Sequence, residues 1–372
     1  MRGRKPRLNL SLTIGFQPDI KLNMKVIAQL KLQTTEEQHE ALLETLERAN
    51  AACNYISERA WEEKTFQKFD LHKLIYYPAK EQFQLSAQVT IRCIAKVSDA
   101  YQLDKKREFR PKGSISYDDR ILRYSENTVS IWTARGRKTI PFLCGENQRR
   151  LLDTRQGESD LIYRNGAFYL HVVCNIDEPP TDNPNGFLGV DLGVVNIAAD
   201  SDGEIHTAEA VENVRVRFSN LRAQLQSVGT KSAKRKLKHV SGKEKRFRTD
   251  KTHCISKRIV LKAKGTRRGI ALEDLNGIRE RTTVKKSQRA RHHTWSFNQL
   301  RQFVSYKAQM YGVSLQVVDP RNTSRTCPSC GHVDKKNRKS QAEFVCTSCS
   351  FSGIADVIAA RNIAVKAACQ SA

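Results

Sequence analysis

Four cysteines near the end of the chain have the spacing of a metal-binding site. Cys327 and Cys330 form one Cys-x-x-Cys pair, Cys346 and Cys349 form a second, and fifteen residues separate the two pairs. This spacing is typical of a four-thiolate zinc site. A closed tetrahedral zinc has no open position for chemistry, so such a site is most often structural. We therefore predict a zinc ribbon that fixes the position of the residues that follow it.

Three acidic residues in the second half of the chain suggest chemistry of their own. Asp356 follows seven residues after the last cysteine, at the start of a helix-like run, and Asp191 and Glu273 each end an apolar, strand-like run. Taken singly, an acid at a strand end is more often structural than catalytic. Three of them in a basic protein favour catalysis, because a carboxylate triad can hold two Mg²⁺ about 3.5–4 Å apart around a phosphodiester.

The charge balance predicts a polyanionic partner. The 372 residues include 64 Lys and Arg against 39 Asp and Glu, a formal net charge of +25. Nucleic acid is the first candidate and an anionic membrane the second, although a ribosomal or histone-like role would give a similar charge. No apolar run has the length of a membrane span and no leader opens the chain, which predicts a soluble, cytoplasmic protein with no membrane partner. The other six cysteines are expected to be small buried hydrophobic residues: Cys53, Cys93, Cys144, Cys174, Cys254 and Cys369.

Two basic segments are candidates for contact with nucleic acid. In the run Lys231–Arg248, Lys234, Arg235 and Lys236 would bind phosphates without reading sequence. The alternative is a solvated helical face. In the ribbon, Lys335, Lys336 and Arg338 are candidates for contact with the substrate strand. Further along, the helical run that includes Trp295 and Tyr311 predicts a core-facing helix, and the adjacent His292 and His293 are assigned no catalytic role.

The remaining pattern indicates which elements must position these residues. Alternation over Val26–Leu32 predicts a strand, and Thr35 with Gln38 forms a capping box before helical sequence. Short alternating runs follow, with a hairpin signal at Asn165-Gly166, so we expect an antiparallel barrel that the first strand joins and the helices interrupt. Predicted segments are a basic arm with the first strand (1–34), helices (35–106), the barrel (107–180), an α/β core (181–322), the ribbon (323–352) and a last core helix (353–372).

Four motifs together resemble the RuvC-type nuclease module of the TnpB family, transposon-encoded RNA-guided nucleases related to type V CRISPR effectors. The motifs are GVDLG at Gly189–Gly193, LEDL at Leu272–Leu275, the CPSCG…CTSC ribbon and ADVIAARNI at Ala355–Ile363. The resemblance runs from about Phe187 to the end of the chain. It implies an α+β multidomain protein with an RNase H-like (RuvC) α/β core and an inserted zinc ribbon. The core would follow an antiparallel, wedge-like β-barrel domain, interrupted by a helical recognition lobe that reads a target-adjacent DNA motif.

The same resemblance implies a function. The protein would be an RNA-guided DNA endonuclease of a transposable element, and it would cleave target DNA by two-metal-ion hydrolysis at Asp191, Glu273 and Asp356. Guide RNA and target DNA would be the partners, Mg²⁺ the catalytic cofactor and Zn²⁺ the structural one. Two positions depart from the family pattern: Ser350 replaces a glycine after the fourth cysteine, and Ile358 replaces an asparagine near the last aspartate, which removes a supporting side chain.

Two other functions remain as alternatives. One is a guide-RNA-dependent repressor that binds DNA without cutting it, and the intact triad argues against it. The other is an RNase H-like transposase, which would need a site-specific DNA-binding domain such as a helix-turn-helix. The sequence offers no clear candidate for such a domain.

Overall fold

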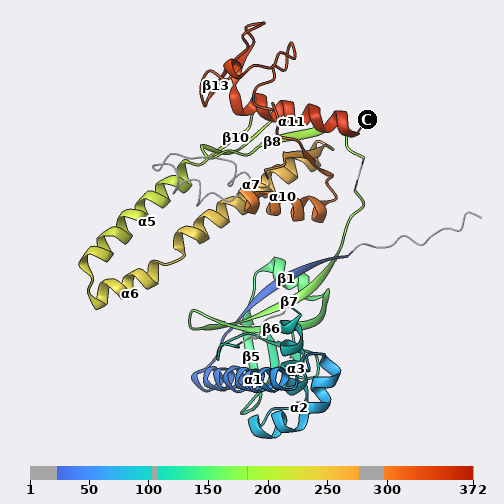
Figure 1. Ribbon diagram of the computed structural model, residues 1–372, viewed down its shortest axis with the longest axis vertical. Coiled ribbons are helices and arrows are strands. Elements are labelled where there is room, and N and C mark those ends of the chain that lie inside the picture. Colours follow the sequence, from blue (N-terminus) through green and yellow to red (C-terminus); the bar gives the residue numbers. More distant parts are fainter. Residues whose placement is uncertain (1–22, 103–107, 182, 276–296, 372) are drawn as a thin grey trace, which may run out of the picture. The chain divides into compact units, whose positions relative to one another are not determined.

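Two compact units make up the protein, residues 1–177 and 178–372. The computed structural model describes residues 23–102, 108–181, 183–275 and 297–371 (Figure 1), so most of the predicted basic arm lies outside the described residues. None of the helices within these ranges has an apolar stretch long enough to cross a membrane.

The first unit contains a seven-stranded antiparallel sheet in the order β2-β6-β7-β1-β5-β4-β3. The end strands β2 and β3 are consecutive in the chain and only four residues apart, so the sheet curls back on itself and is nearly closed. The predicted first strand does join it, since β1 pairs with both β7 and β5. The strands are β1 (Asn23–Leu32), β2 (Ile115–Tyr117), β3 (Leu122–Tyr124), β4 (Thr128–Thr133), β5 (Gly136–Leu143), β6 (Arg155–Arg164) and β7 (Ala167–Asp177).

The turn predicted at Asn165-Gly166 connects β6 to β7. Both residues have positive φ, 54° and 79°, as a two-residue turn that matches the twist of the strands requires. The predicted capping box is also present. The side chain of Thr35 accepts a hydrogen bond from the amide of Gln38, and the Gln38 side chain accepts one from the amide of Thr35.

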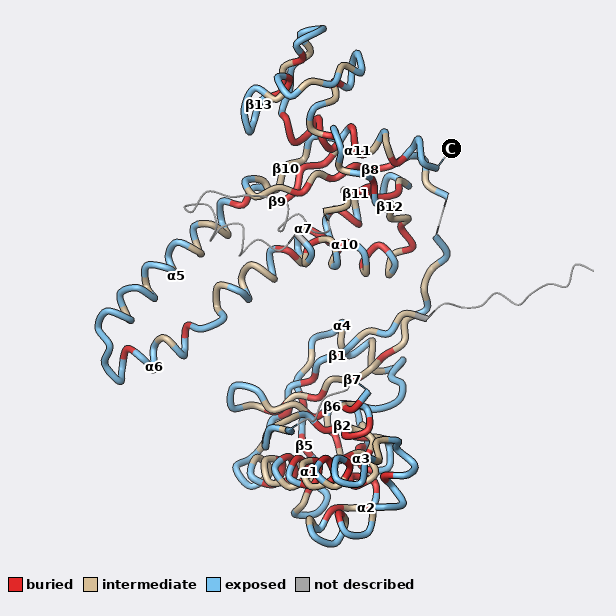
Figure 2. Tube along the Cα trace, in the orientation of Figure 1, coloured by how far each residue is buried: buried red, intermediate tan, exposed pale blue. Residues whose placement is uncertain are grey.

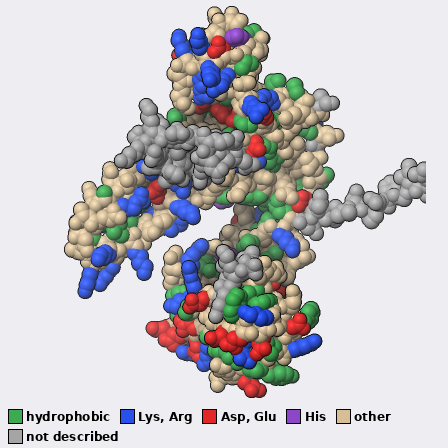
Figure 3. All heavy atoms as spheres, viewed as in Figure 1, with side chains coloured by type: hydrophobic (Ala, Val, Ile, Leu, Met, Phe, Trp, Pro, Cys, Tyr) green, Lys and Arg blue, Asp and Glu red, His purple; other side chains and the backbone are tan. Residues whose placement is uncertain are grey.

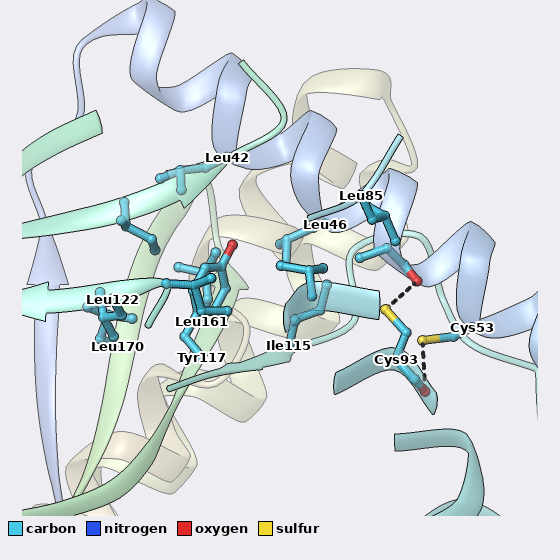
Figure 4. Close-up of a cluster of buried hydrophobic side chains, with 14 of the residues drawn as sticks. Leu42, Leu46, Cys53, Leu85, Cys93, Ile115, Tyr117, Leu122, Leu161 and Leu170 are labelled. Carbon is cyan, nitrogen blue, oxygen red and sulfur yellow. Dashed lines mark hydrogen bonds between the residues drawn. The ribbon is translucent and has the colours of Figure 1, made fainter. Parts of the chain in front are cut away.

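Three helices lie between β1 and β2 in the chain and pack against the sheet. They share one core with it, and Figure 4 shows part of that core, where the two buried thiols Cys53 and Cys93 contact backbone carbonyls. The helices are α1 (Glu36–Glu62), α2 (Lys68–Phe83) and α3 (Ala87–Tyr101), and a short α4 (Glu146–Leu152) follows β5.

The second unit is built on a five-stranded sheet in the order β10-β9-β8-β11-β12. Strands β8, β11 and β12 are parallel to one another, and the hairpin of β9 and β10 extends the sheet beyond β8. The strands are β8 (Phe187–Asp191), β9 (Asn196–Asp200), β10 (Ile205–Thr207), β11 (Gly269–Glu273) and β12 (Leu315–Val318).

Helices cover both faces of this sheet (Figure 1). Leu188, Val190, Ile270 and Leu272 point toward the face covered by α7 (Lys243–Gly265) and α10 (Phe297–Tyr311). Phe187 and Ala271 point to the opposite face, which α11 (Ala355–Ser371) covers. Alternate residues of one strand therefore serve two different layers, as the pleat of a strand requires.

An arm of helices precedes the central part of α7. It consists of α5 (Glu209–Val228), α6 (Lys231–Val240) and the start of α7, and α5 has no fully buried residue, as Figure 2 shows. Between β12 and α11 the chain forms the cysteine segment. It contains the short helix η1 (Lys335–Asn337) and the two-stranded sheet of β13 (Glu343–Val345) and β14 (Ser352–Ile354).

The expectation that the unpaired cysteines are all buried is wrong for two of them. Cys53, Cys93 and Cys174 are buried and Cys144 is partly buried. Cys254 and Cys369 are exposed, because each lies on the outward side of a helix whose other side packs against the sheet.

Candidate functional site

The structure brings the three predicted acids to one face of the five-stranded sheet. Asp191 and Glu273 end the parallel neighbours β8 and β11, in which Val190 lies opposite Leu272. The next residues along the two strands are therefore Asp191 and Glu273. They share the face of Phe187 and Ala271, which is the face covered by α11.

Gly189 of β8 allows α11 to lie close to that strand. A Cβ added to Gly189 would lie 1.9 Å from the carbonyl oxygen of Ala360 and 2.7 Å from the amide nitrogen of Ala364. Any side chain at this position would push the helix backbone away from the strand. Since Asp356 lies in the first turn of α11, the close contact at Gly189 also sets how near Asp356 comes to the strand ends.

Asp356 has two side-chain partners from different parts of the chain. Asn196, the first residue of β9, donates from Nδ2 to Oδ2 at 2.8 Å, and Arg338 donates from Nη2 to Oδ1 at 3.1 Å. Asp356 is only 6% exposed. The start of a helix also favours a carboxylate, because the unpaired backbone N–H groups there carry partial positive charge.

The acids affect one another's ionisation. Burial raises the pKa of Asp191 to about 7, with further increases from the charges of Glu273 and Asp356 and a smaller opposing effect from Arg338. Burial also raises the pKa of Glu273, and the hydroxyl of Thr323, which donates to its Oε1, opposes the rise. Ionising all three acids together is therefore costly unless a cation joins them.

The acids are less tightly gathered than the cysteines. Among the described residues, the one group of three or more His, Cys, Asp or Glu whose ligand atoms all lie within 4.8 Å of one another is the cysteine cluster. The carboxylates do not reach that spacing. Two of them have side-chain partners instead: Asp356 is hydrogen-bonded to Arg338 and Asn196, and Glu273 to Thr323.

The cysteine cluster has the geometry of a four-thiolate metal site. The Sγ atoms of Cys327 and Cys349 are 3.6 Å apart, as are those of Cys330 and Cys346. Four thiolates about 2.3 Å from a tetrahedral zinc would be about 3.8 Å from one another. The amides of Ser348 and Cys349 also point at the sulfur of Cys346, at 3.4 and 3.5 Å. The donors therefore fit zinc.

The predicted basic residues have different positions. Lys234, Arg235 and Lys236 are exposed on α6, and Lys335 and Lys336 are exposed on η1. Lys and Arg side chains gather at the far end of the arm in Figure 3. Arg338, by contrast, is brought to the acids.

The core-facing side of α10 is as predicted, since Leu300 and Val304 are buried. The predictions for His292, His293 and Trp295 lie outside the described residues.

Sequence reasoning missed four residues that support the acids: Asn196, Thr323, Asn362, and Arg338 in its role as an ion-pair partner. Asn362 is buried and donates to the carbonyls of Thr323 and Thr326, which ties the start of the cysteine segment to α11. Ile358, where the resemblance led us to expect an asparagine, packs instead with Phe344 in the core of the ribbon. Asn196 donates a hydrogen bond to Asp356 from its carboxamide. Its place at the start of the strand that follows β8 is the one feature of the sequence that could have pointed to this role.

Comparison with known proteins shows the family. Residues 171–277 match a family model described as a probable transposase, and residues 297–363 match the Cas12f1-like TNB domain. A TnpB-like protein of Methanocaldococcus jannaschii is 32% identical over 265 residues, which cover 65% of this chain and 92% of that protein. The chain belongs to the TnpB family.

Two further likenesses extend this result. The CRISPR-associated endodeoxyribonuclease Cas12f1 of Sulfoacidibacillus thermotolerans is 30% identical over 223 residues, 54% of this chain and about half (51%) of that protein. A solved structure, the complex of Cas12f1 with sgRNA and target DNA, superimposes with a TM-score of 0.57 at 16% identity, over 89% of this chain and 83% of that one. The likeness shows that this TnpB-family chain shares its fold with Cas12f1.

Proposed function

We propose that this TnpB-family protein is an RNA-guided DNA endonuclease whose active site consists of Asp191, Glu273 and Asp356. The main observation is that three acids spread over 165 residues of the sequence come together on one face of the sheet. Burial there raises the pKa of Asp191 to about 7, and the charges of Glu273 and Asp356 add to the rise. Such a cluster of mutually repelling, buried carboxylates is costly for a fold and is typical of a cation-binding functional site. The sheet with helices on both faces would then be the RuvC-like core.

The donor set fits Mg²⁺, which prefers carboxylate oxygens. Asp191, Glu273 and Asp356 would hold the cations, which when bound polarise the phosphodiester and favour a water-derived nucleophile. Thr323 orients the carboxylate of Glu273, and Asn196 orients that of Asp356. The hydrogen bond from Thr323 lowers the pKa of Glu273 and so favours its ionised form, as a cation ligand must have.

Arg338 connects the ribbon to the acids. Its guanidinium donates to Asp356 and also to the carbonyl of Gln341, so its side chain is held in a defined position. Its charge lowers the pKa of both Asp191 and Glu273, against the effect of burial. A planar guanidinium is also suited to phosphate oxygens, which makes Arg338 the ribbon residue best placed to bind the scissile strand.

Zinc at the four cysteines would have a positioning role. The segment that it closes contains Arg338 and ends just before Asp356, and Asn337 at its centre is fully buried and hydrogen-bonded to Arg325 and His332 carbonyls. A rigid ribbon would therefore fix the positions of both Arg338 and Asp356.

Guide RNA and target DNA are the proposed partners. Relatives in the comparison are named as RNA-guided DNA endonucleases, including the putative enzyme InsQ of Escherichia coli strain K12, 24% identical over 53% of this chain. The exposed cations Lys234, Arg235 and Lys236 on α6 would bind backbone phosphates. Substitution of these three should weaken RNA binding about equally for every guide sequence, since phosphate contacts read no bases.

A repressor without nuclease activity is the second candidate, and the observed site does not favour it. All three acids are present, and Glu273 and Asp356 each have a hydrogen-bond partner that orients the carboxylate. A transposase is suggested only by the description of the family model that matches residues 171–277.

Cleavage by the full-length protein purified with its own RNA tests the proposal. A linear DNA that contains the matching target should be cut with Mg²⁺ and remain intact with EDTA. Asp202→Asn is a suitable control because Asp202 pairs with Arg268 outside the acid centre. Target binding without any cleavage in Mg²⁺ would support the repressor, and cleavage that survives removal of the RNA would contradict RNA guidance.

A further inference from the structure

A hollow on the outer side of α7 has the apolar and cationic lining of a nucleotide-binding site. It has a volume of about 480 Å³, within the range of small-ligand pockets, about 300–1,000 Å³. Its lining is His206 of β10 together with six residues of α7: Lys251, Cys254, Ile255, Lys257, Arg258 and Leu261. No Asp or Glu is among these described lining residues.

The helix itself explains how the hollow arises. One side of α7 is buried against the sheet and α10, through Thr252, Ser256 and Ile259 among others. Residues 251, 254, 255, 258 and 261 follow one another at helical spacing on the other side. There Leu261 is 43% exposed, an apolar surface that no described part of the chain covers, and Cys254, which also lines the hollow, is exposed.

The cations around this apolar floor are available to a ligand. Within the described ranges neither Lys251 nor Lys257 has a carboxylate oxygen within 4.0 Å, and Lys251 lies over the ring of Phe247, 5.5 Å from its centroid. Arg258 contacts Glu204 at 3.3 Å but remains largely exposed, with 71% of its side chain accessible. An apolar floor with a cationic rim suits a base or ribose below and phosphates at the edge.

We propose that this α7 hollow binds the guide RNA, by seating one unstacked nucleotide whose phosphates contact Lys251 and Lys257. The proposal rests on the RNA-guided function above. RNA is favoured over the DNA being cut because α7 lies on the face of the sheet opposite to the acids, so a strand in the hollow is not at the cleavage centre.

Cys254 provides a direct test in the intact protein. The full-length protein purified with its RNA, and the same protein after ribonuclease treatment and a salt wash, would be treated with N-ethylmaleimide and analysed by peptide mass spectrometry. Bound RNA should slow alkylation of Cys254 several-fold. Cys369, exposed on α11, is the internal control and should react at the same rate in both samples.

Variants test the phosphate contacts separately. Lys251→Glu with Lys257→Glu should lower the amount of retained RNA and reduce the salt dependence of binding by about 0.7 in log–log slope for each lost contact. The matched pair Lys251→Arg with Lys257→Arg keeps the charges and should bind RNA as the native protein does.

Each other outcome overturns the inference in a recognisable way. Protein that holds RNA but leaves Cys254 fully reactive would refute this seat and leave the proposed function intact. Protection that appears only when target DNA is added would assign the hollow to DNA, and protection that persists after ribonuclease treatment would indicate an acidic protein or peptide. Protein that holds no RNA at all would contradict the proposed function itself.

Discussion

The cysteine cluster and the acid centre, the two proposed cation sites, are built in opposite ways. The four cysteines lie within 23 residues, and their sulfurs are already at metal-site spacing. The three acids come from β8, β11 and α11 and do not gather within 4.8 Å. Asp356 pairs with Arg338 and Asn196, and Glu273 accepts a hydrogen bond from Thr323. A permanent ion calls for ligands in their final places. A site that exchanges cations and substrate can use side chains that hold its ligands apart.

The largest expected effect is at the acids. Asp191→Asn, Glu273→Gln and Asp356→Asn should each lower the cleavage rate by about three orders of magnitude or more, about 4 kcal/mol of transition-state stabilisation. RNA and target binding should remain, since charge is lost from a site that repels phosphate. Cleavage rates measure the first effect, and filter binding measures the retained RNA and target binding. A variant that cuts at the native rate would remove its residue from the site.

A smaller effect is expected at the cysteines, because in the proposed function they position catalytic groups and do not touch the substrate. Cys346→Ser should abolish stoichiometric zinc and lower cleavage about 10- to 100-fold, the range typical of groups that orient metal ligands. Metal analysis and cleavage rates measure the two effects, and Cys369→Ser is the control. An active native preparation without zinc would make the comparison between the two sites invalid.

The contact between α11 and β8 should show a stability effect. Gly189→Ala places a methyl group against the backbone of Ala360, so we expect about 1–3 kcal/mol of destabilisation, as for other overpacked sites. Gly265→Ala is a matched control, since an added Cβ there meets nothing within 4 Å. Urea unfolding measures both. Equal stability of the two variants would mean that α11 can shift, and that Asp356 is not fixed by this contact.

The smallest effect concerns a buried cation outside both sites. Lys307 is 8% exposed and donates to the carbonyl of His253 and the hydroxyl of Ser256, and burial lowers its pKa to about 8 from 10.5. Between pH 8 and 10.5 the unfolded chain keeps the proton that the folded chain has lost, so this group makes stability rise with pH there. Below pH 8 both states are charged and the dependence disappears.

Lys307→Met should remove this rise. The difference in melting temperature between the variant and the native protein should be larger at pH 7.5 than at pH 9.5, in favour of the variant. A difference that does not change with pH would show that Lys307 has an ordinary pKa in the folded protein.

Local patterns in the sequence predicted several features well. The capping box at Thr35, the Asn165-Gly166 turn and the cysteine cluster all depend on residues close in the chain, so their geometry follows from spacing. The pairing of Arg338 with Asp356, and of Asn196 with the same carboxylate, depends on how β9, the ribbon and α11 pack together. No spacing in the sequence encodes that packing. The prediction that Cys254 is buried was wrong for the same reason, since the sequence pattern alone does not say which side of α7 faces the sheet.

The most direct test of the central claim is a change of guide. Full-length protein would be assembled with two RNAs that differ only in the guide portion, and each complex would be offered both matching DNAs with the same flanking motif. Base pairing should direct the cut, because a protein of this kind needs to read only duplex shape and a short flank. We predict that each complex cuts its own target in Mg²⁺, and that Asp191→Ala cuts neither. If both complexes cut the same DNA, or Asp191→Ala cuts its target at the native rate, the account of an RNA-guided nuclease with this active site is contradicted.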